Sequence, residues 1–444
     1  MRQRWSLNIE GFGKIRSARV RIAPMVLFVG ENNSGKSYLV SLLWGILVRG
    51  RSVFPKEPPA SDAYRQCAYL LKQRPTAVNR EFESALVDWF NTLLRSRKNE
   101  LVREVFATQD LSIDHLSVTD YERKKTLALE WDEKTEPGNW RFSNRQDSVR
   151  FPIVEGEPES EAEVYRRLQY LCWKLIMGDL SAPLFPPGLA AGRRRAEGEP
   201  LYLPAARSGF MLTYRSLVSE VMNVFYGEEV NSTFTMPVVR FLQGLAENGS
   251  SVKARLAPIA DYLEEQLLEG KVRVKKRGVN EYSYQPSEGR QSLPYHLTSS
   301  LVGELTPLVI FLRSNISYKS VILEEPEAHL HPELQKRLTC VLSRIVSAGV
   351  PVWCTTHSDT IFQQVNNLMR LHDHPDRQEL MGHYGYQEDD LLPPEDVAAY
   401  QFVREKGRTE VKALERTEDG FAAPTFNEAL IRLSEETFAF TRDE

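Results

Sequence analysis

The sequence predicts an α/β fold with a mostly parallel β-sheet. Two patterns predict it. Short apolar runs alternate with segments whose apolar residues recur at helical spacing, an order typical of strands and helices that build a parallel sheet. In addition, a glycine-rich loop at residues 30–37 lies between the apolar run 25–29 and a helical pattern at 37–47. A strand, a glycine loop and a helix in this order are typical of the start of such a fold.

The composition is that of a globular protein. The chain has 444 residues, 42% hydrophobic and 26% charged, which is enough for two or three domains or for one large domain with an insertion. The net charge of −4 argues against a protein that coats nucleic acid, although it leaves room for a local basic patch. No window approaches the roughly 20 apolar residues of a membrane span. The four cysteines form no C-x-x-C pair, so we expect a cytoplasmic protein without structural zinc or disulfides.

Three parts follow one another along the chain. Residues 1–50 are expected to start the main domain, with β-strands over 4–29 before the loop and helix. Segments rich in proline and glycine bound residues 51–200, which we interpret as an insertion of mixed helices and strands. Residues 201–444 are expected to complete the main domain. Their predicted elements are helices at 209–227, 237–247, 255–270, 299–316, 332–349 and 426–440, a hairpin at 271–286, and strands at 321–323, 352–354, 398–403 and 409–415.

The glycine loop has the pattern G-x-x-x-x-G-K-[ST], which is typical of a phosphate-binding loop (P-loop). Backbone N–H groups of such a loop and the positive end of the helix dipole hold the β- and γ-phosphates of a nucleotide. The lysine reaches the same phosphates, and the serine hydroxyl binds Mg²⁺. We therefore predict that ATP and Mg²⁺ are bound by Gly30, Asn32, Asn33, Ser34, Gly35, Lys36 and Ser37.

A second motif, VILEEPEAHLHP, spans residues 321–332. Its apolar strand ends in two adjacent carboxylates, and two carboxylates at a strand tip that faces a P-loop have separate roles. We expect Glu324 to hold Mg²⁺ and Glu325 to act as the general base for the attacking water. The alternative is a solvated loop that merely contains two glutamates.

A third motif, VWCTTHSD, places His357 at the tip of another apolar strand. A histidine there can donate a hydrogen bond to the γ-phosphate and respond to its loss. A structural histidine is the alternative. The alternation of His329, His331 and Glu333 would also allow metal binding, but no further His or Cys cluster supports such a site, so we interpret these residues as structural.

Together, GENNSGKS, EEPEAHLHP and TTHS resemble the ATP-binding cassette (ABC) class of P-loop ATPases. More narrowly they resemble the OLD/RecF-like AAA-family ATPases of bacterial genome maintenance and anti-phage defence. YLPAARSGF at 202–210 is similar to another segment of those proteins, and LTSSLVGELTPLVIFL at 297–312 lies where their signature motif belongs. The resemblance covers residues 4–50 and roughly 200–440. It implies an ABC-type P-loop ATPase head with a mixed α/β insertion.

The resemblance also implies a composite site, in which two heads enclose ATP between them. Ser299 and Ser300, with Gly303 nearby, would contact the γ-phosphate held by a second copy, so a homodimer or higher homo-oligomer is expected. The segment SSLVGE departs from the usual signature pattern, and no Q-loop glutamine can be placed. Only 87 residues follow His357 (444 − 357), so we expect no Toprim nuclease domain.

Three functional hypotheses remain from the sequence. The first is an ATPase sensor that regulates a separately encoded effector, a nuclease or toxin, in anti-phage defence. The second is a RecF-like clamp on DNA, for which a basic triplet at 193–195 and the segment KVRVKKR, with Tyr282 and Tyr284 after it, are candidate contacts, or else solvated surface. The third, the motor of a membrane transporter, is disfavoured because 288 residues separate Lys36 from Glu324; we expect no membrane partner.

Overall fold

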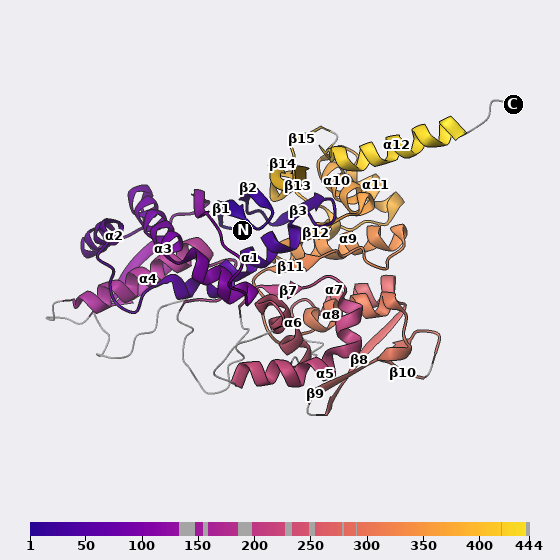
Figure 1. Ribbon diagram of the computed structural model, residues 1–444, viewed down its shortest axis with the longest axis horizontal. Coiled ribbons are helices and arrows are strands. Elements are labelled where there is room, and N and C mark those ends of the chain that lie inside the picture. The colour runs from indigo at the N-terminus through magenta and orange to yellow at the C-terminus, as the bar shows by residue number, and fades with distance from the viewer. Residues whose placement is uncertain are drawn as a thin grey trace.

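The computed structural model describes residues 1–132, 147–153, 159–184, 198–226, 233–247, 254–277, 279–289, 291–418 and 420–440 (Figure 1). The basic triplet at 193–195 lies outside these ranges. A nine-stranded sheet forms the centre, in the order β4-β1-β2-β14-β13-β3-β12-β11-β7. Its strands are β1 (Gln3–Phe12), β2 (Ile15–Arg21), β3 (Met25–Gly30), β4 (His115–Arg123), β7 (Leu201–Leu203), β11 (Val321–Glu324), β12 (Val352–Thr356), β13 (Val397–Glu405) and β14 (Arg408–Ala413).

Smaller sheets and the helices surround this centre. The short strands are β5 (Ala128–Asp132), β6 (Ser148–Pro152), β8 (Gly270–Arg277), β9 (Val279–Pro286), β10 (Leu293–Pro294), β15 (Arg416–Thr417) and β16 (Gly420–Phe421). The α-helices are α1 (Lys36–Arg49), α2 (Asp62–Lys72), α3 (Arg80–Phe106), α4 (Glu161–Met177), α5 (Arg207–Tyr226), α6 (Met236–Glu247), α7 (Ala257–Leu263), α8 (Ser300–Leu312), α9 (Pro332–Ser347), α10 (Asp359–Asp373), α11 (Arg377–Tyr384) and α12 (Pro424–Phe440). Single turns are η1 (Gly50–Val53), η2 (Glu264–Leu268), η3 (Tyr295–Leu297), η4 (Glu388–Asp390) and η5 (Pro394–Asp396).

The predicted α/β class is confirmed, and the central sheet is mixed, with five parallel and three antiparallel pairings. Strands β13, β3, β12, β11 and β7 run parallel to one another, and β14 runs parallel to β2. Three pairings, β1–β2, β1–β4 and β13–β14, are antiparallel. Two of these, β1–β2 and β13–β14, join strands that directly follow one another and form hairpins, which local apolar patterns do not distinguish from parallel neighbours.

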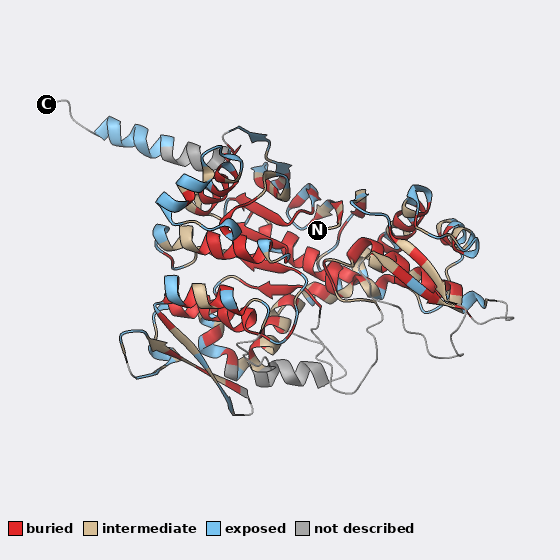
Figure 2. Ribbon diagram, turned by 180° about the vertical axis from the view of Figure 1, so that it is seen from behind, coloured by how far each residue is buried: buried red, intermediate tan, exposed pale blue. Residues whose placement is uncertain are grey.

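Both faces of the sheet are buried, as a central parallel strand requires. Along β3, Val26 and Phe28 belong to a core shared with α1–α4, whereas Met25, Leu27 and Val29 belong to a core shared with α5–α10. Figure 2 shows the buried centre between these two layers. The burial fixes β3 firmly, and the loop that follows β3 therefore starts from a rigid support.

The segment 51–200 is joined to the main sheet. Its strand β4 pairs with β1 at the sheet edge, Leu7 opposite Val118, and its helices α3 and α4 contribute to the same core as α1. Two further strands of this segment, β5 and β6, pair with each other. Helices α2–α4 lie at one end of the molecule, away from α5 and the β8–β9 hairpin (Figure 1).

The last helix, α12, projects from the body (Figure 1). Its large side chains Ile431, Leu433, Phe438 and Phe440 are exposed. Among the described residues, no helix combines the length and apolar character needed to cross a membrane.

Candidate active site

The glycine loop follows β3 and turns into α1 as predicted. Its turns need backbone angles that glycine adopts freely: φ is 146° at Gly30 and 99° at Gly35, the residue that precedes α1. A side chain at Gly30 would also collide with Phe402, whose Cβ lies 2.8 Å from the position of an added Cβ. Asn33 has a φ of 60° as well, in the left-handed region that asparagine tolerates. Asn32 and Asn33 are exposed, whereas Ser34 is buried.

Lys36 lies in the first turn of α1 and folds back over the loop. Its Nζ donates to the carbonyl oxygens of Gly30 (2.9 Å) and Glu31 (2.7 Å). Burial lowers the pKa of this lysine to about 8, although the charges of nearby carboxylates, Glu325 first, oppose that shift. A buried ammonium held at the mouth of a backbone loop is suited to bind an anion, because phosphate oxygens would relieve its desolvation.

Glu324, the last residue of β11, is buried with only 5% of its surface exposed. The Tyr202 hydroxyl donates to its carboxylate and lies 2.9 Å from the Ser41 hydroxyl. Burial raises the pKa of Glu324, and the nearby hydroxyls of Ser37 and Tyr202 oppose the rise. Strand register explains why Glu324 lies next to the P-loop. Glu324 pairs with Thr355, and Thr355 pairs with Phe28, two residues before Gly30.

The contact between Ser37 and Glu324 fits a magnesium ion. A hydroxyl and a carboxylate oxygen are hard ligands of the kind that Mg²⁺ prefers, and Mg²⁺ in such sites takes one or two protein ligands together with phosphates and water. Within the described part of the chain, no group of three His, Cys, Asp or Glu side chains is placed to hold a metal by itself. The residues present therefore suit a metal that arrives with a nucleotide.

Glu325 and His357 meet beside the loop. His357 Nε2 lies 3.5 Å from Glu325 Oε1, and hydrogen bonding to His357 is the main cause that lowers the pKa of this carboxyl. The backbone at Glu325 has a φ of 44°, a strained conformation for glutamate. Its N–H is held by the carbonyl (3.0 Å) and hydroxyl (3.2 Å) of Thr355. A carboxylate that stays ionised and is fixed in direction is suited to accept a proton from water.

Glu327, two residues further on, was not singled out from the sequence. Its Oε1 accepts the backbone N–H of His357 at 2.5 Å, and burial raises the pKa of this carboxyl. Its other oxygen is buried and has no hydrogen-bond partner within the described residues. The third glutamate of EEPE is thus part of the site, and it ties the loop after β11 to the loop after β12.

Arg207 was also missed, although the segment that contains it had been noted for its resemblance. Its Nη1 donates to the Glu324 carbonyl (2.5 Å) and its Nη2 to the Glu325 carbonyl (3.2 Å). The same guanidinium forms an ion pair with Glu304 of α8, at 2.8 Å. Both side chains are buried, with exposed fractions of 2% and 0%. An arginine next to LPAA gives no sign of burial in the sequence, so this role was visible only in the structure.

The signature candidates lie at the start of α8. Ser299 accepts the N–H of Val302 (3.4 Å) and so caps the helix, and Ser300 is exposed. Gly303 packs closely on α5, since an added Cβ would lie 3.0 Å from Ser208 Cβ. Within the described residues no hydrogen bond joins Ser299 or Ser300 to the P-loop of the same chain.

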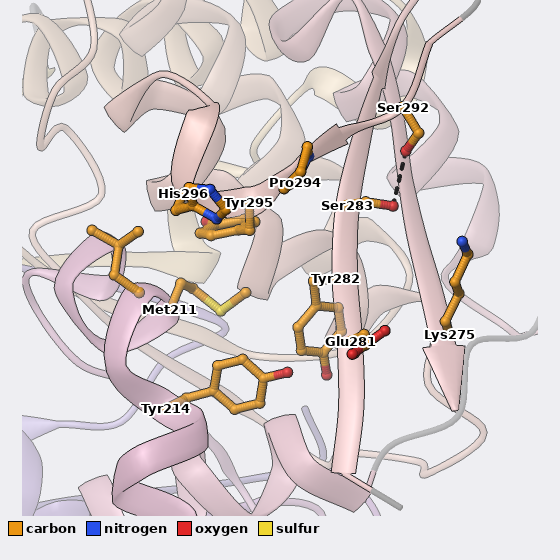
Figure 3. Close-up of a pocket in the computed structure, with 11 residues that line it drawn as sticks. Met211, Tyr214, Lys275, Glu281, Tyr282, Ser283, Ser292, Pro294, Tyr295 and His296 are labelled. Carbon is orange, nitrogen blue, oxygen red and sulfur yellow. Dashed lines mark hydrogen bonds between the residues drawn. The ribbon is translucent and has the colours of Figure 1, made fainter. Parts of the chain in front are cut away.

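A pocket of about 410 Å³ lies between α5, the β8–β9 hairpin and η3, the turn that precedes α8 (Figure 3). Met211 and Tyr214 of α5 line one side, Tyr282 of β9 lines another, and Tyr295 and His296 of η3 complete it. Tyr295 also donates to the carbonyl of Val302 in α8 (3.4 Å), so the pocket and α8 share a wall.

The fold and this site define a P-loop ATPase. In agreement, residues 230–362 match a family model described as "AAA domain, putative AbiEii toxin, Type IV TA system". That range contains Glu324, Glu325 and His357. No curated protein shows significant sequence similarity to the chain.

Similar solved structures include three heads of SMC proteins. One is an SMC head bound to the C-winged helix domain of ScpA, with 11% identity and a TM-score of 0.38 over 92% of this chain and 97% of that one. The SMC head domain from Thermotoga maritima gives 11% identity and a TM-score of 0.34 over 94% and 100%. The SMC head from Pyrococcus furiosus with an extended coiled coil, bound to the C-terminal domain of ScpA, gives 10% and 0.36 over 97% and 98%.

Proposed function

We propose that the protein is an ATP-driven switch: it binds ATP with Mg²⁺, closes onto a second copy, hydrolyses the nucleotide and reopens. One observation carries the proposal. About 300 residues separate the P-loop in sequence from the carboxylates at the end of β11 and from the histidine after β12. The fold nevertheless brings the three segments together at the carboxyl ends of the strands. There Lys36, Glu324, Glu325 and His357 interact electrostatically.

Each of these residues has a separate task. Loop N–H groups and Lys36 bind the β- and γ-phosphates. Ser37 and Glu324 hold Mg²⁺, which neutralises phosphate charge when it is bound. Glu325 accepts a proton from the attacking water, and its lowered pKa keeps it ionised for that purpose. His357, oriented by Glu325 and by the backbone contact to Glu327, donates to the γ-phosphate.

A second copy completes the site through Ser299 and Ser300. Support comes from their placement: the start of α8 is exposed and makes no hydrogen bond with the described residues of its own P-loop. An exposed helix start, with free N–H groups and the positive end of the helix dipole, favours an anion. The γ-phosphate held by the other copy has that charge.

The switch is proposed to regulate a separately encoded effector, a nuclease or toxin, in bacterial anti-phage defence. The support for this part is the OLD-like motif set and the matched family, whose description mentions a toxin of a toxin–antitoxin system. The test of this part is whether a neighbouring gene encodes a nuclease or toxin and whether its product co-purifies with this protein.

A RecF-like DNA clamp is the second candidate, because the β8–β9 hairpin exposes Arg273, Lys275 and Lys276. The interpretation of Tyr282 and Tyr284 as nucleic-acid contacts is wrong, however. Both rings are buried, and their hydroxyls donate to the backbone carbonyls of Leu245 and Leu268. Any contact with nucleic acid at this hairpin is therefore electrostatic and sensitive to salt.

The test compares Glu325→Gln with Lys36→Ala. Glu325→Gln should bind ATP, hydrolyse it about a hundredfold or more slowly, and shift to twice the monomer mass or more in light scattering when ATP and Mg²⁺ are added. Lys36→Ala should bind no ATP and keep its mass. If Glu325→Gln hydrolysed ATP at the native rate, Glu325 would not be the general base. If the mass did not change on addition of ATP, a second copy would not complete the site. Stimulation of hydrolysis by duplex DNA would favour the clamp.

A further inference from the structure

A buried ion pair connects the two halves of the proposed site within one chain. Arg207 is the first residue of α5, and Glu304 lies one turn into α8. Besides the ion pair, Arg207 Nε donates to the Glu304 carbonyl at 3.2 Å. The Glu304 carboxylate also accepts the backbone N–H groups of Arg207 (3.3 Å) and Ser208 (3.0 Å), so it caps the start of α5. Helices α5 and α8 are thereby fixed to each other.

The same arginine fixes the backbone of the general base. Glu325 is held from two sides: Thr355 binds its N–H, and Arg207 binds its carbonyl oxygen. A left-handed φ persists only where surrounding contacts determine it. The Arg207 guanidinium helps to hold this backbone conformation, because its rigid fork donates to the Glu324 and Glu325 carbonyls together.

The other end of the link reaches the start of α8, which the proposed function places against a second copy. Glu304 lies four residues after Ser300, about one helical turn along α8. Gly303, beside it, packs tightly on α5, since an added Cβ would lie 3.0 Å from Ser208 Cβ. A displacement of α8 therefore moves α5 and Arg207 with it, and Arg207 is bonded to the carbonyl of the base.

We propose that Arg207 is a positioning residue that sets the direction of Glu325 and transmits the docking of a second copy on α8 to that base. The proposal rests on the proposed function, since it assigns the partner copy a route to the hydrolytic residue. Binding at Ser300 and hydrolysis at Glu325 of one chain are then coupled through Glu304 and Arg207.

The experiment separates positioning from mere support of the fold. Arg207→Lys keeps a charge beside Glu304, but an ammonium cannot reach two carbonyls and a carboxylate as the fork does. Arg207→Met/Glu304→Gln removes both charges and leaves an acceptor for the start of α5, so no unpaired charge remains buried. The buried pair Arg344–Asp390, 2.6 Å apart and between α9 and η4, is the matched control as Arg344→Met/Asp390→Asn.

We expect both Arg207 variants to lower kcat about tenfold or more, with a KM for ATP within about threefold of the wild type and a thermal midpoint close to it. In the Glu325→Gln background, Arg207→Lys should still assemble with ATP. Native kcat in either variant that is folded at the assay temperature would overturn the proposal. So would an equal loss of kcat in the control pair, or a loss of assembly. An inactive wild type would instead remove the proposed function itself.

Discussion

The Glu325 carboxylate lies 3.5 Å from His357 Nε2, and both residues stand at the ends of neighbouring parallel strands. The histidine is the main cause of the lowered pKa of this carboxyl. One contact thus links the proposed general base to the histidine that is proposed to face the γ-phosphate. Its consequence is a pH dependence with a definite sign.

Replacement of His357 by alanine should move the acid limb of the kcat/KM profile to higher pH. A base works only when ionised, and its folded pKa is depressed, so activity is present above that pKa and lost as pH falls through it. Without His357 the pKa of Glu325 rises toward its ordinary value, and the loss begins at higher pH. The measurement is the ATPase rate from pH 4 to 8. His331→Ala, on an exposed residue outside these contacts, should leave the limb in place, and superimposed profiles for wild type and His357→Ala would contradict the assignment.

ATP affinity should fall as pH rises above about 8. The pKa of Lys36 is lowered to about 8, so the lysine is protonated below that value and neutral above it, while bound phosphates favour the protonated form. Binding then takes up one proton, and Kd should rise by up to about tenfold per pH unit above the pKa. Titration of a fluorescent ATP analogue at pH 7 to 10 measures this. Lys36→Arg, which stays charged, should give a flat profile; a wild-type Kd independent of pH would exclude this role of the lysine.

The sequence was sufficient where the signal is local. The runs 25–29, 321–323 and 352–354 are apolar and are followed by a glycine or a polar residue, and the structure aligns all three as neighbouring strands. Parallel strands place their carboxyl ends at one edge, which is why Lys36 and Glu325 could be expected to meet.

The sequence did not predict which distant strands pair or which charged side chains are buried. Nothing in HLSVTDYER indicates that Val118 pairs with Leu7, more than a hundred residues earlier, because the local pattern of a strand does not specify its partner. Arg207 and Glu304 look like ordinary surface residues in the sequence, since charged side chains are mostly exposed. Only tertiary structure reveals that they are buried against each other.

Tyr202→Phe should weaken the response to Mg²⁺. The Tyr202 hydroxyl donates to Glu324 and lies next to Ser41. Without that donor the buried carboxylate is less well oriented, and partners that orient metal ligands typically contribute 10- to 100-fold in affinity. We expect the Mg²⁺ concentration at half-maximal ATPase rate to rise about tenfold, with little change in kcat at saturating Mg²⁺. The control is Tyr165→Phe, which removes a buried tyrosine hydroxyl of α4 that donates to the Pro55 carbonyl. An unchanged Mg²⁺ requirement in Tyr202→Phe would reject the role of Tyr202.

Glu327→Gln should stabilise the protein at neutral pH more than at pH 4.5. Burial raises the pKa of Glu327 in the folded state, so its contribution to stability is fully present below the unfolded pKa and is lost as pH rises through the folded pKa. Glutamine keeps an acceptor for the N–H of His357 and carries no charge at any pH, which removes the loss. Glu327→Ala, which cannot accept that N–H, should also lower kcat about tenfold because His357 is then held less firmly.

The stability prediction is checked by the thermal midpoint of wild type and Glu327→Gln at pH 4.5 and 7.5, with Glu333→Gln on the exposed start of α9 as control. If the midpoint of Glu327→Gln differs from that of the wild type equally at both pH values, burial does not raise the pKa of Glu327.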